Sequence, residues 1–201
     1  MTTLPQKFYP VVDNALWVER LGAAGARFIQ LRVKDLPEAE LRAQVRLARD
    51  YAARHGVCLV LNDFWQLALE EGVSYIHLGQ EDLDTADMPA IRKGGLRIGI
   101  STHCHEELER ALSFAPDYVA LGPIWETRLK KMAFGPQGVE KLRDWKQRIG
   151  EMPLVAIGGV TLQRAPLCLQ AGADCVSAVS AFTQHADPEG QVRAWQVATG
   201  G

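Results

Sequence analysis

The chain has 201 residues, a length typical of one domain, and 47% of them are hydrophobic and 23% are charged. This composition excludes a disordered chain, a collagen-like repeat and a coiled coil. Because 22 Lys and Arg residues stand against 24 Asp and Glu residues, the net charge is −2. No basic excess exists to bind a nucleic-acid backbone or an anionic membrane surface. Neither nucleic acid nor a membrane is therefore predicted as a partner, whereas a local cationic pocket stays compatible with the composition.

The N-terminal sequence lacks the pattern of a signal peptide, because the apolar stretch from Phe8 is short and Asp13 interrupts it. No apolar run approaches the roughly 20 residues of a membrane span. The four cysteines form no CxxC pair, and an even count without a signal is weak evidence for disulfides. The sequence therefore predicts reduced thiols and a cytoplasmic enzyme.

Eight short apolar segments alternate with longer amphipathic segments. The apolar segments are bounded by Gly, Asp or Asn and are predicted to be strands, over Phe8–Asp13, Arg27–Arg32, Val57–Leu61, Tyr75–Leu78, Arg97–Ile100, Asp117–Leu121, Leu154–Ile157 and Asp174–Ser180. Helices are predicted over Pro37–His55, Phe64–Glu71, Asp84–Lys93, Glu106–Phe114, Gly138–Arg148, Leu162–Ala171 and Pro188–Val197.

Counting gives eight strands, and each strand after the first is followed by one of the seven predicted helices. Strands joined by helical crossovers must run parallel, and eight such units match a (β/α)8 TIM barrel, whose lower size limit is about 200 residues. A single barrel domain is predicted over residues 1–201. An open doubly wound sheet is the alternative, but its GxGxxG dinucleotide fingerprint is missing. In the barrel, functional residues are expected at the C-terminal ends of the strands.

Polar side chains follow the second predicted strand. Gln30, Arg32 and Lys34 alternate with Leu31 and Val33, so the polar residues share one face of the strand and the apolar residues share the other. The inner face of a barrel is an unfavourable place for charge without a function. The pattern favours an anion-binding wall inside the barrel mouth over two cations exposed at a frayed strand end.

Acidic residues follow the next two strands. Asp63 comes shortly after the third strand, and Asp82 follows the fourth. Two carboxylates at one rim suit Mg²⁺, which prefers oxygen ligands and keeps several waters. Asp63 equally suits the N-cap of the next helix, but its pairing with Asp82, opposite the cations of the second strand, favours a metal site.

Ser101 follows the fifth predicted strand and shares a face with Gly99. The next residues include His103 and His105, which are potential transition-metal ligands. The His-Cys-His run has neighbours on opposite faces and lacks a CxxC or HxxxH companion. A loop and helix cap is therefore the favoured interpretation of this run.

The connection after the sixth strand, Ile124–Gln137, is far longer than the usual 2–6 residues. It carries Arg128, Lys130 and Lys131, which favours a lid over an anionic ligand; a solvated basic loop is the alternative. Loops after the seventh and eighth strands commonly bind phosphate through backbone N–H groups, and Gly159 permits a close backbone approach. The sequence thus predicts two anion sites, one at the second strand beside the two carboxylates and one at the loops after the seventh and eighth strands. This arrangement predicts that a diphosphate and a monophosphate bind in the same mouth.

At these segments the sequence resembles the thiamine-phosphate synthase family. The resemblance runs from about residue 8 to residue 195, and its specificity lies in the order of the whole set. The matching segments are Gln30–Asp35, Leu61–Asp63, His77–Asp82, Gly99–His103, Ala120–Pro123, Val155–Gly159 and Val179–Ala181.

The resemblance implies a transferase of thiamine biosynthesis with two small-molecule substrates and Mg²⁺ as cofactor. A hydroxymethylpyrimidine diphosphate loses pyrophosphate, and the nitrogen of a thiazole phosphate attacks the exposed methylene to give thiamine phosphate. The implied diphosphate contacts are Gln30, Arg32, Lys34, Asn62, Ser101 and Lys130, of which Arg32, Lys34, Ser101 and Lys130 are expected to act in catalysis. The implied Mg²⁺ ligands are Asp63 and Asp82. The implied thiazole phosphate cradle is Thr127, Gly159, Val179 and Ser180.

The loop after the sixth strand departs from the family pattern. It usually reads Pro-Thr-x-Thr-Lys, whereas here Glu126 replaces the proline and Leu129 replaces the second threonine. One hydroxyl donor to the thiazole phosphate is therefore absent, and Arg128 is a candidate substitute.

Three other functions stay open. The oligomeric state stays open as well, and the sequence is compatible with a homo-oligomer. A related barrel that isomerises the thiazole carboxylate phosphate need not keep the diphosphate-binding residues. This chain retains Arg32, Lys34, Asn62, Asp63 and Asp82, which argues against the isomerase. A phosphosugar isomerase or epimerase would need an acid and base pair, for which His77 and Asp35 are weak candidates. A non-catalytic sensor of thiamine precursors would have no use for the acidic pair or Lys130.

Overall fold

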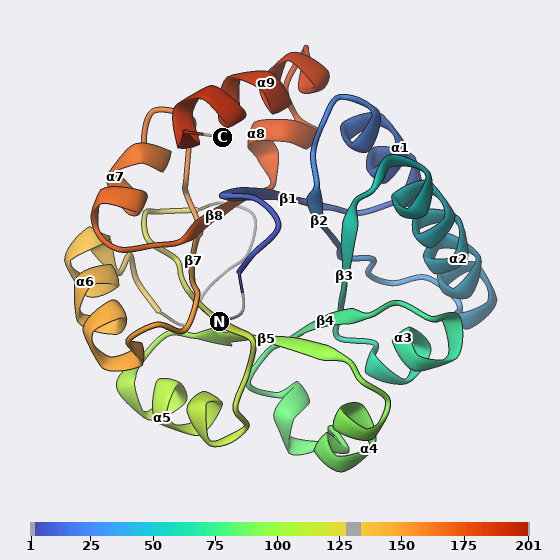
Figure 1. Ribbon diagram of the computed structural model, residues 1–201, viewed down its shortest axis with the longest axis horizontal. Helices are drawn as coiled ribbons and strands as arrows, with labels where there is room; N and C mark the ends of the chain where they lie inside the picture. The colour runs from blue at the N-terminus through green and yellow to red at the C-terminus, as the bar shows by residue number, and fades with distance from the viewer. Residues whose placement is uncertain (1–2, 128–133, 201) are drawn as a thin grey trace.

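The structure is a computed structural model that describes residues 3–127 and 134–200. Eight parallel strands close into a barrel in chain order, and β8 pairs with β1 (Figure 1). The strands are β1 (Phe8–Val12), β2 (Phe28–Leu31), β3 (Cys58–Asn62), β4 (Tyr75–Leu78), β5 (Arg97–Thr102), β6 (Tyr118–Leu121), β7 (Leu154–Ile157) and β8 (Cys175–Ala178). This closed order confirms the predicted (β/α)8 barrel and contradicts the open sheet.

Helices surround the barrel on the outside (Figure 1). They are α1 (Ala15–Ala23), α2 (Glu38–His55), α3 (Trp65–Glu71), α4 (Met88–Lys93), α5 (His105–Ser113), α6 (Gly138–Ile149), α7 (Ala165–Gln170), α8 (Ser180–Thr183) and α9 (Pro188–Thr199), with a short 3₁₀ helix, η1, over Asp82–Asp84. The predicted helix over 84–93 begins later than expected. The Asp87 side chain accepts a hydrogen bond from the Ala90 N–H at 2.9 Å, which caps α4 and separates it from η1.

The end of the eighth strand also differs from the prediction. Strand β8 ends at Ala178, and Ser180 is the first residue of the short helix α8. The Phe182 and Thr183 N–H groups both donate to the carbonyl of Val179, which turns the chain into this helix. The predicted strand over 174–180 was therefore too long at both ends.

Two apolar layers hold the barrel. The larger lies between the strands and the helices, and the smaller fills the barrel interior. The interior layer is dominated by four aromatic rings, among which Tyr9 meets Phe28 edge-on with ring centroids 4.7 Å apart, and Tyr75 meets Tyr118 at 5.7 Å. Side chains alternate along a strand. The next inward-facing residues of these strands, toward their C-terminal ends, therefore form the floor of the mouth.

The four cysteines, Cys58, Cys104, Cys168 and Cys175, are all free, in agreement with the predicted reduced thiols. Burial raises the pKa of the Cys168 thiol to about 12, so this thiol is inert at neutral pH. None of the helices in the described part of the chain is long and apolar enough to span a membrane.

Candidate functional site

The predicted polar wall at the end of β2 is present. Gln30 is 3% exposed and continues the inward column of Phe28, while Leu31 and Val33 are buried in the outer layer. Arg32 is half-buried, and Lys34 lies beyond it at the rim. The predicted alternation is therefore confirmed for Gln30 against Leu31 and Val33, while Arg32 and Lys34 lie past the end of β2.

Lys34 contacts the first predicted acidic residue. Its Nζ lies 2.5 Å from Oδ2 of Asp63, so the ends of β2 and β3 are joined by an ion pair. The backbone of Asp63 has φ = +67°, a conformation that Asp tolerates better than most residues. Helix α3 has Phe64 as its N-cap and no side-chain cap. The alternative of Asp63 as a helix cap is therefore wrong.

The second acidic residue faces the first. Burial raises the pKa of the Asp82 carboxyl, the Gly79 N–H that donates to its Oδ2 at 2.7 Å lowers it, and the nearby Asp63 carboxylate raises it. Mutual repulsion of this kind is what a shared cation relieves. Asp63 and Asp82, the acidic pair, can thus supply two oxygen ligands to Mg²⁺. No group of three His, Cys, Asp or Glu side chains converges among residues 3–127 and 134–200, so other ligands would be phosphate and water oxygens.

Asn62 lies beside His77 in the β3–β4 register and is 6% exposed. It continues the inward column of Val60, so its side chain belongs to the same mouth as Gln30. The Asp63 N–H donates to the carbonyl of His77 at 2.9 Å. The ends of β3 and β4 are therefore held together directly below the acidic pair.

Ser101 is hydrogen-bonded to His77, which from the sequence was only a weak candidate for an isomerase acid or base. Its Oγ is 2.7 Å from Nε2 of His77, and Nδ1 of the same ring is 2.7 Å from the Tyr118 hydroxyl. Burial lowers the pKa of His77 to about 4, with Asp63 opposing and Arg32 assisting this shift. The imidazole is neutral at pH 7. The alternation of Tyr75 and His77 on the inner face is the sequence signal that could have indicated this contact.

Gln80 and Arg110 hold the loop after β4 against β5. The Gln80 amide donates to the Ser101 carbonyl at 2.8 Å. Arg110, from α5, donates to the Gln80 carbonyl at 3.1 Å and pairs with Asp84 at 2.5 Å. This loop carries Asp82, so its position relative to Ser101 is set by contacts on both sides.

The four residues of the predicted phosphate cradle come from three neighbouring strand ends. Gly159 follows β7, Val179 and Ser180 follow β8, and Thr127 follows β6. A Cβ added to Gly159 would lie 2.6 Å from the Glu126 carbonyl oxygen, so the close approach at this glycine is made by the β6 loop of the chain itself. Ser180 is exposed and Val179 half-buried. The structure brings these residues to the same rim as the acidic pair.

Residues 128–133 lie outside the described residues. They include Leu129, where the loop departs from the family pattern, and the predicted lid cations Arg128, Lys130 and Lys131. The described ends of the loop meet, because Gln137 N–H donates to the Pro123 carbonyl at 2.8 Å and Gly138 N–H donates to the Ile124 carbonyl at 3.0 Å. The bases of this long connection are thus fixed to each other.

The histidines of the His-Cys-His run point to different carboxylates. His103 Nδ1 is 2.7 Å from Glu107, and His105 Nε2 is 2.6 Å from Asp144. The Glu107 carboxylate also accepts the His103 N–H at 2.7 Å. These contacts agree with the predicted loop before α5, but the helix cap is not confirmed, because the N-cap residue Cys104 makes no side-chain capping hydrogen bond.

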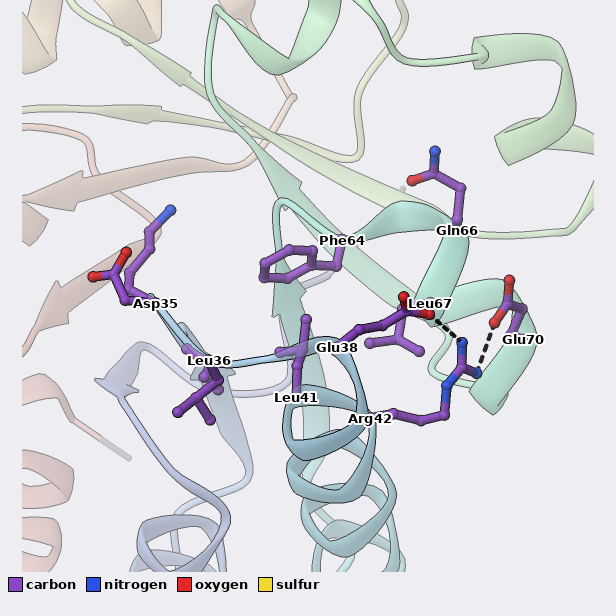
Figure 2. A pocket seen from close by; sticks show the side chains of 11 residues that line it. Asp35, Leu36, Glu38, Leu41, Arg42, Phe64, Gln66, Leu67 and Glu70 are labelled. Atoms are coloured by element: carbon purple, nitrogen blue, oxygen red, sulfur yellow. Dashed lines mark hydrogen bonds and ion pairs between the residues drawn. The ribbon is translucent and has the colours of Figure 1, made fainter.

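A pocket of about 330 Å³ lies beside the mouth, between the segment after β2 and the starts of α2 and α3. Figure 2 shows the Phe64 ring over it and Arg42 between Glu38 and Glu70. Lys34 is its one lining residue from the predicted site. The pocket is therefore a neighbour of the mouth rather than its centre.

The fold and this rim define a (β/α)8-barrel enzyme, with cations and paired carboxylates at the C-terminal ends of its strands. A family model described as thiamine monophosphate synthase matches residues 8–182. The chain therefore belongs to the thiamine monophosphate synthase family, as the resemblance predicted.

Individual relatives agree with this membership. A thiamine-phosphate synthase of Rhizobium etli is 55% identical over 192 residues, which are 96% of this chain and 94% of that relative. One from Neisseria meningitidis is 48% identical over 194 residues, with the same coverage of 96% and 94%. The solved structure of a thiamine phosphate pyrophosphorylase from Pyrococcus furiosus has a TM-score of 0.85 at 24% identity and covers 96% of this chain and 95% of that one. This last likeness supports the fold.

Proposed function

We propose that this chain joins the hydroxymethylpyrimidine diphosphate to the thiazole phosphate, giving thiamine phosphate and pyrophosphate in thiamine biosynthesis. Family membership supports the reaction. The observation that carries it in the structure is the convergence of Lys34, Asp63 and Asp82 at one rim, with Lys34 Nζ 2.5 Å from Asp63. A cation beside two carboxylates is the arrangement expected for a metal-bound diphosphate. The isomerase and sensor alternatives lack a comparable observation.

Departure of pyrophosphate requires neutralisation of the negative charge that develops on it. Arg32 and Lys34 rise along the wall of the mouth toward that group, and Lys130 is proposed to add a third cation from the β6 loop. Gln30 and Asn62 are buried in the mouth and are proposed to orient the pyrimidine diphosphate. Bound Mg²⁺, held by the acidic pair, would supply further positive charge to the diphosphate oxygens.

The thiazole phosphate is proposed to lie on the opposite side of the mouth, at Thr127, Gly159, Val179 and Ser180. The thiazole nitrogen already carries a lone pair, so this chain needs no general base for the attack. The chain's task is to hold the two substrates in line and to shield the exposed methylene from water. The proposal also includes a single barrel domain that acts in the cytoplasm. The free cysteines support this location.

The test is a product assay on the purified protein. With both substrates and Mg²⁺, thiamine phosphate and pyrophosphate should appear in equal amounts, and omission of either substrate or addition of a chelator should stop both. Binding of the precursors without pyrophosphate release would identify a sensor instead. Conversion of the thiazole carboxylate phosphate alone to an isomer would identify the isomerase.

A further inference from the structure

A continuous hydrogen-bonded row runs from the barrel interior to the mouth. The Tyr9 and Tyr118 hydroxyls are 3.4 Å apart, Tyr118 reaches Nδ1 of His77 at 2.7 Å, and Nε2 of His77 reaches Ser101 at 2.7 Å. Tyr9 and Tyr118 are fully buried and His77 is 7% exposed, whereas Ser101 is half-exposed at the strand end. These four residues, the polar row, join the buried interior of the barrel to the site.

The chemistry of the groups gives the row a direction. A phenol is a stronger acid than a neutral imidazole N–H, and an imidazole nitrogen is a stronger acceptor than a phenol oxygen. The short contact between Tyr118 and Nδ1 is therefore O–H···N. The hydrogen bond at one ring nitrogen sets the proton at the other, so His77 carries its proton on Nε2 and donates it to Ser101 Oγ. The Tyr118 oxygen is left to accept from Tyr9.

The direction matters for Ser101. If the serine oxygen accepts from His77, its own proton is free to point into the mouth and to donate to an anionic oxygen there. The reverse direction would turn the serine proton inward to the ring and present only lone pairs to an anion. Arg32 and Lys34 on the facing wall make the mouth a site for anions. In the first direction the serine proton can donate to an anionic oxygen there, whereas in the second direction the serine lone pairs would repel it.

We propose that His77 is a positioning residue that, oriented by Tyr118, presents the Ser101 hydroxyl as a donor to the departing diphosphate. The proposal rests on the proposed function for its ligand. Ser101 is the catalytic residue of the two, because it reaches the substrate, and His77 acts through it. Tyr118 holds the ring from behind by a hydrogen bond and by stacking, with ring centroids 5.6 Å apart. The Gln80 amide holds the backbone of Ser101 from the other side.

Two amide substitutions at position 77 separate positioning from structure. In His77→Gln the side-chain amide reaches the place of Nε2 and can still donate to Ser101, whereas in His77→Asn it reaches only the place of Nδ1 and keeps the Tyr118 contact. Both variants lose the ring and stay polar, which makes them matched. We expect kcat of His77→Asn to fall about tenfold or more below that of His77→Gln, since small displacements of a reacting group carry penalties of this order. KM for both substrates should change less than kcat.

The serine supplies the control. In a Ser101→Ala background, the difference in kcat between His77→Gln and His77→Asn should disappear, because the group that His77 positions is absent. Equal kcat for the two amide variants in the natural background, or a difference that persists without the serine, would overturn the proposal. Thermal melts of the variants show whether each is folded at the assay temperature.

The tautomer gives a readout that does not depend on activity, and it needs His77→Asn only as a folded reference for assignment. The ¹⁵N resonances of a protonated and a bare ring nitrogen are well separated, and the five histidines can be assigned by the loss of one set in His77→Asn. We expect His77 of the natural protein to carry its proton on Nε2. A proton on Nδ1, or on both nitrogens at pH 7, would overturn the direction of the row. Absence of thiamine phosphate synthesis by the natural protein would defeat the proposed function, and the tautomer would still decide the direction.

Discussion

At the scale of single residues, the acidic pair has to bind a cation in the liganded protein and has to be tolerated by the fold without one. Asp63 is compensated by Lys34 at 2.5 Å, while the Asp82 carboxylate accepts a hydrogen bond from the Gly79 N–H at 2.7 Å. The pKa of Asp82 is raised, chiefly by burial. Residues arranged for a ligand often reduce the stability of the unliganded fold, and Asp82 is the residue of the site where this cost is expected.

Asp82→Asn should leave the metal-free protein at least as stable as the natural one at pH 7. A carboxyl whose folded pKa is raised costs stability once the pH exceeds that pKa, and costs none below the unfolded pKa, where both states bind the proton. Any gain from the substitution should therefore vanish at about pH 3. Thermal melts with a chelator at the two pH values measure this, and pyrophosphate release should be largely lost.

The exposed neighbour Glu81 provides the comparison, since Glu81→Gln removes a charge from the same loop and should leave the rate of pyrophosphate release nearly unchanged. If Asp82→Asn instead melts well below the natural protein and keeps its activity, the carboxylate is structural and the metal assignment fails.

At the scale of elements, α2 and α3 are joined by a buried carboxylate. Glu71 is 5% exposed and is contacted by Arg46 and by Arg42, each at 2.7 Å, while Arg49 donates to the Glu71 carbonyl at 2.9 Å. Arg46 and then Arg42 lower the pKa of Glu71. The three arginines lie on successive turns of α2, so the contact fixes α3 along this helix beside the loops of the acidic pair.

Glu71→Gln should destabilise the protein at neutral pH. A lowered folded pKa contributes stability that is complete above the ordinary Glu range and is lost as the pH falls through the folded pKa. The difference in urea midpoint between Glu71→Gln and the natural protein should therefore shrink below about pH 4. Glu70→Gln is the matched control, because Glu70 pairs with Arg42 but is 54% exposed, and exposed pairs contribute little. Equal effects of the two substitutions would contradict the importance of burial.

The loops after β6 and β7 depend on a second element-scale contact, at Gly159. Gly159→Ala should cost more stability than Gly56→Ala. Both glycines have positive φ, at +66° and +64°, so both alanines carry the same backbone strain of about 1–2 kcal/mol. A Cβ at Gly56 meets open space, whereas at Gly159 it would lie 2.6 Å from the Glu126 carbonyl oxygen and 2.7 Å from Cβ of Trp125. Thermal melts compare the two, and equal losses would show that the β6 loop moves aside freely.

At the scale of the whole molecule, closure of the barrel converts local sequence segments into one site. The mouth takes residues from the ends of strands around the barrel, from β2 to β8, and β1 closes the ring by pairing with both of these strands. A ligand that contacts several strand ends therefore stabilises the closed barrel as a unit. The stabilisation grows with ligand concentration as RT ln(1 + [L]/Kd), about 2.7 kcal/mol at a hundredfold excess over Kd.

Mg²⁺ and pyrophosphate together should raise the melting temperature of the natural protein, and each alone should raise it less. Asp82→Asn should abolish the joint effect, because the shared cation is lost, while Glu81→Gln should preserve it. A thermal-shift titration measures all four combinations. An equal shift for Asp82→Asn and the natural protein would place the Mg²⁺-pyrophosphate complex elsewhere.

Several features were determined by the sequence itself. The eight alternating segments predicted the barrel because strands with helical crossovers must run parallel, and the alternation of Gln30, Arg32 and Lys34 predicted the inner wall because side chains alternate along a strand. The ordered motifs of the strand ends predicted the family. Each of these rests on local periodicity or on the order of segments, which a sequence carries directly.

Only the tertiary structure decided which of the side chains meet. Asp63 suited the N-cap of the next helix, and only the structure showed that Phe64 is the N-cap of α3 and that the Asp63 carboxylate pairs with Lys34, 29 residues away. The partnership of His77 with Ser101 and Tyr118 spans 24 and 41 residues, and the crowding at Gly159 comes from the loop after β6. Contacts of this kind depend on the register of neighbouring strands around the closed barrel. The alternation within one segment shows which side chains share a face, but the residue that each of them meets lies on another strand and is fixed only when the strands pair in register around the closed barrel.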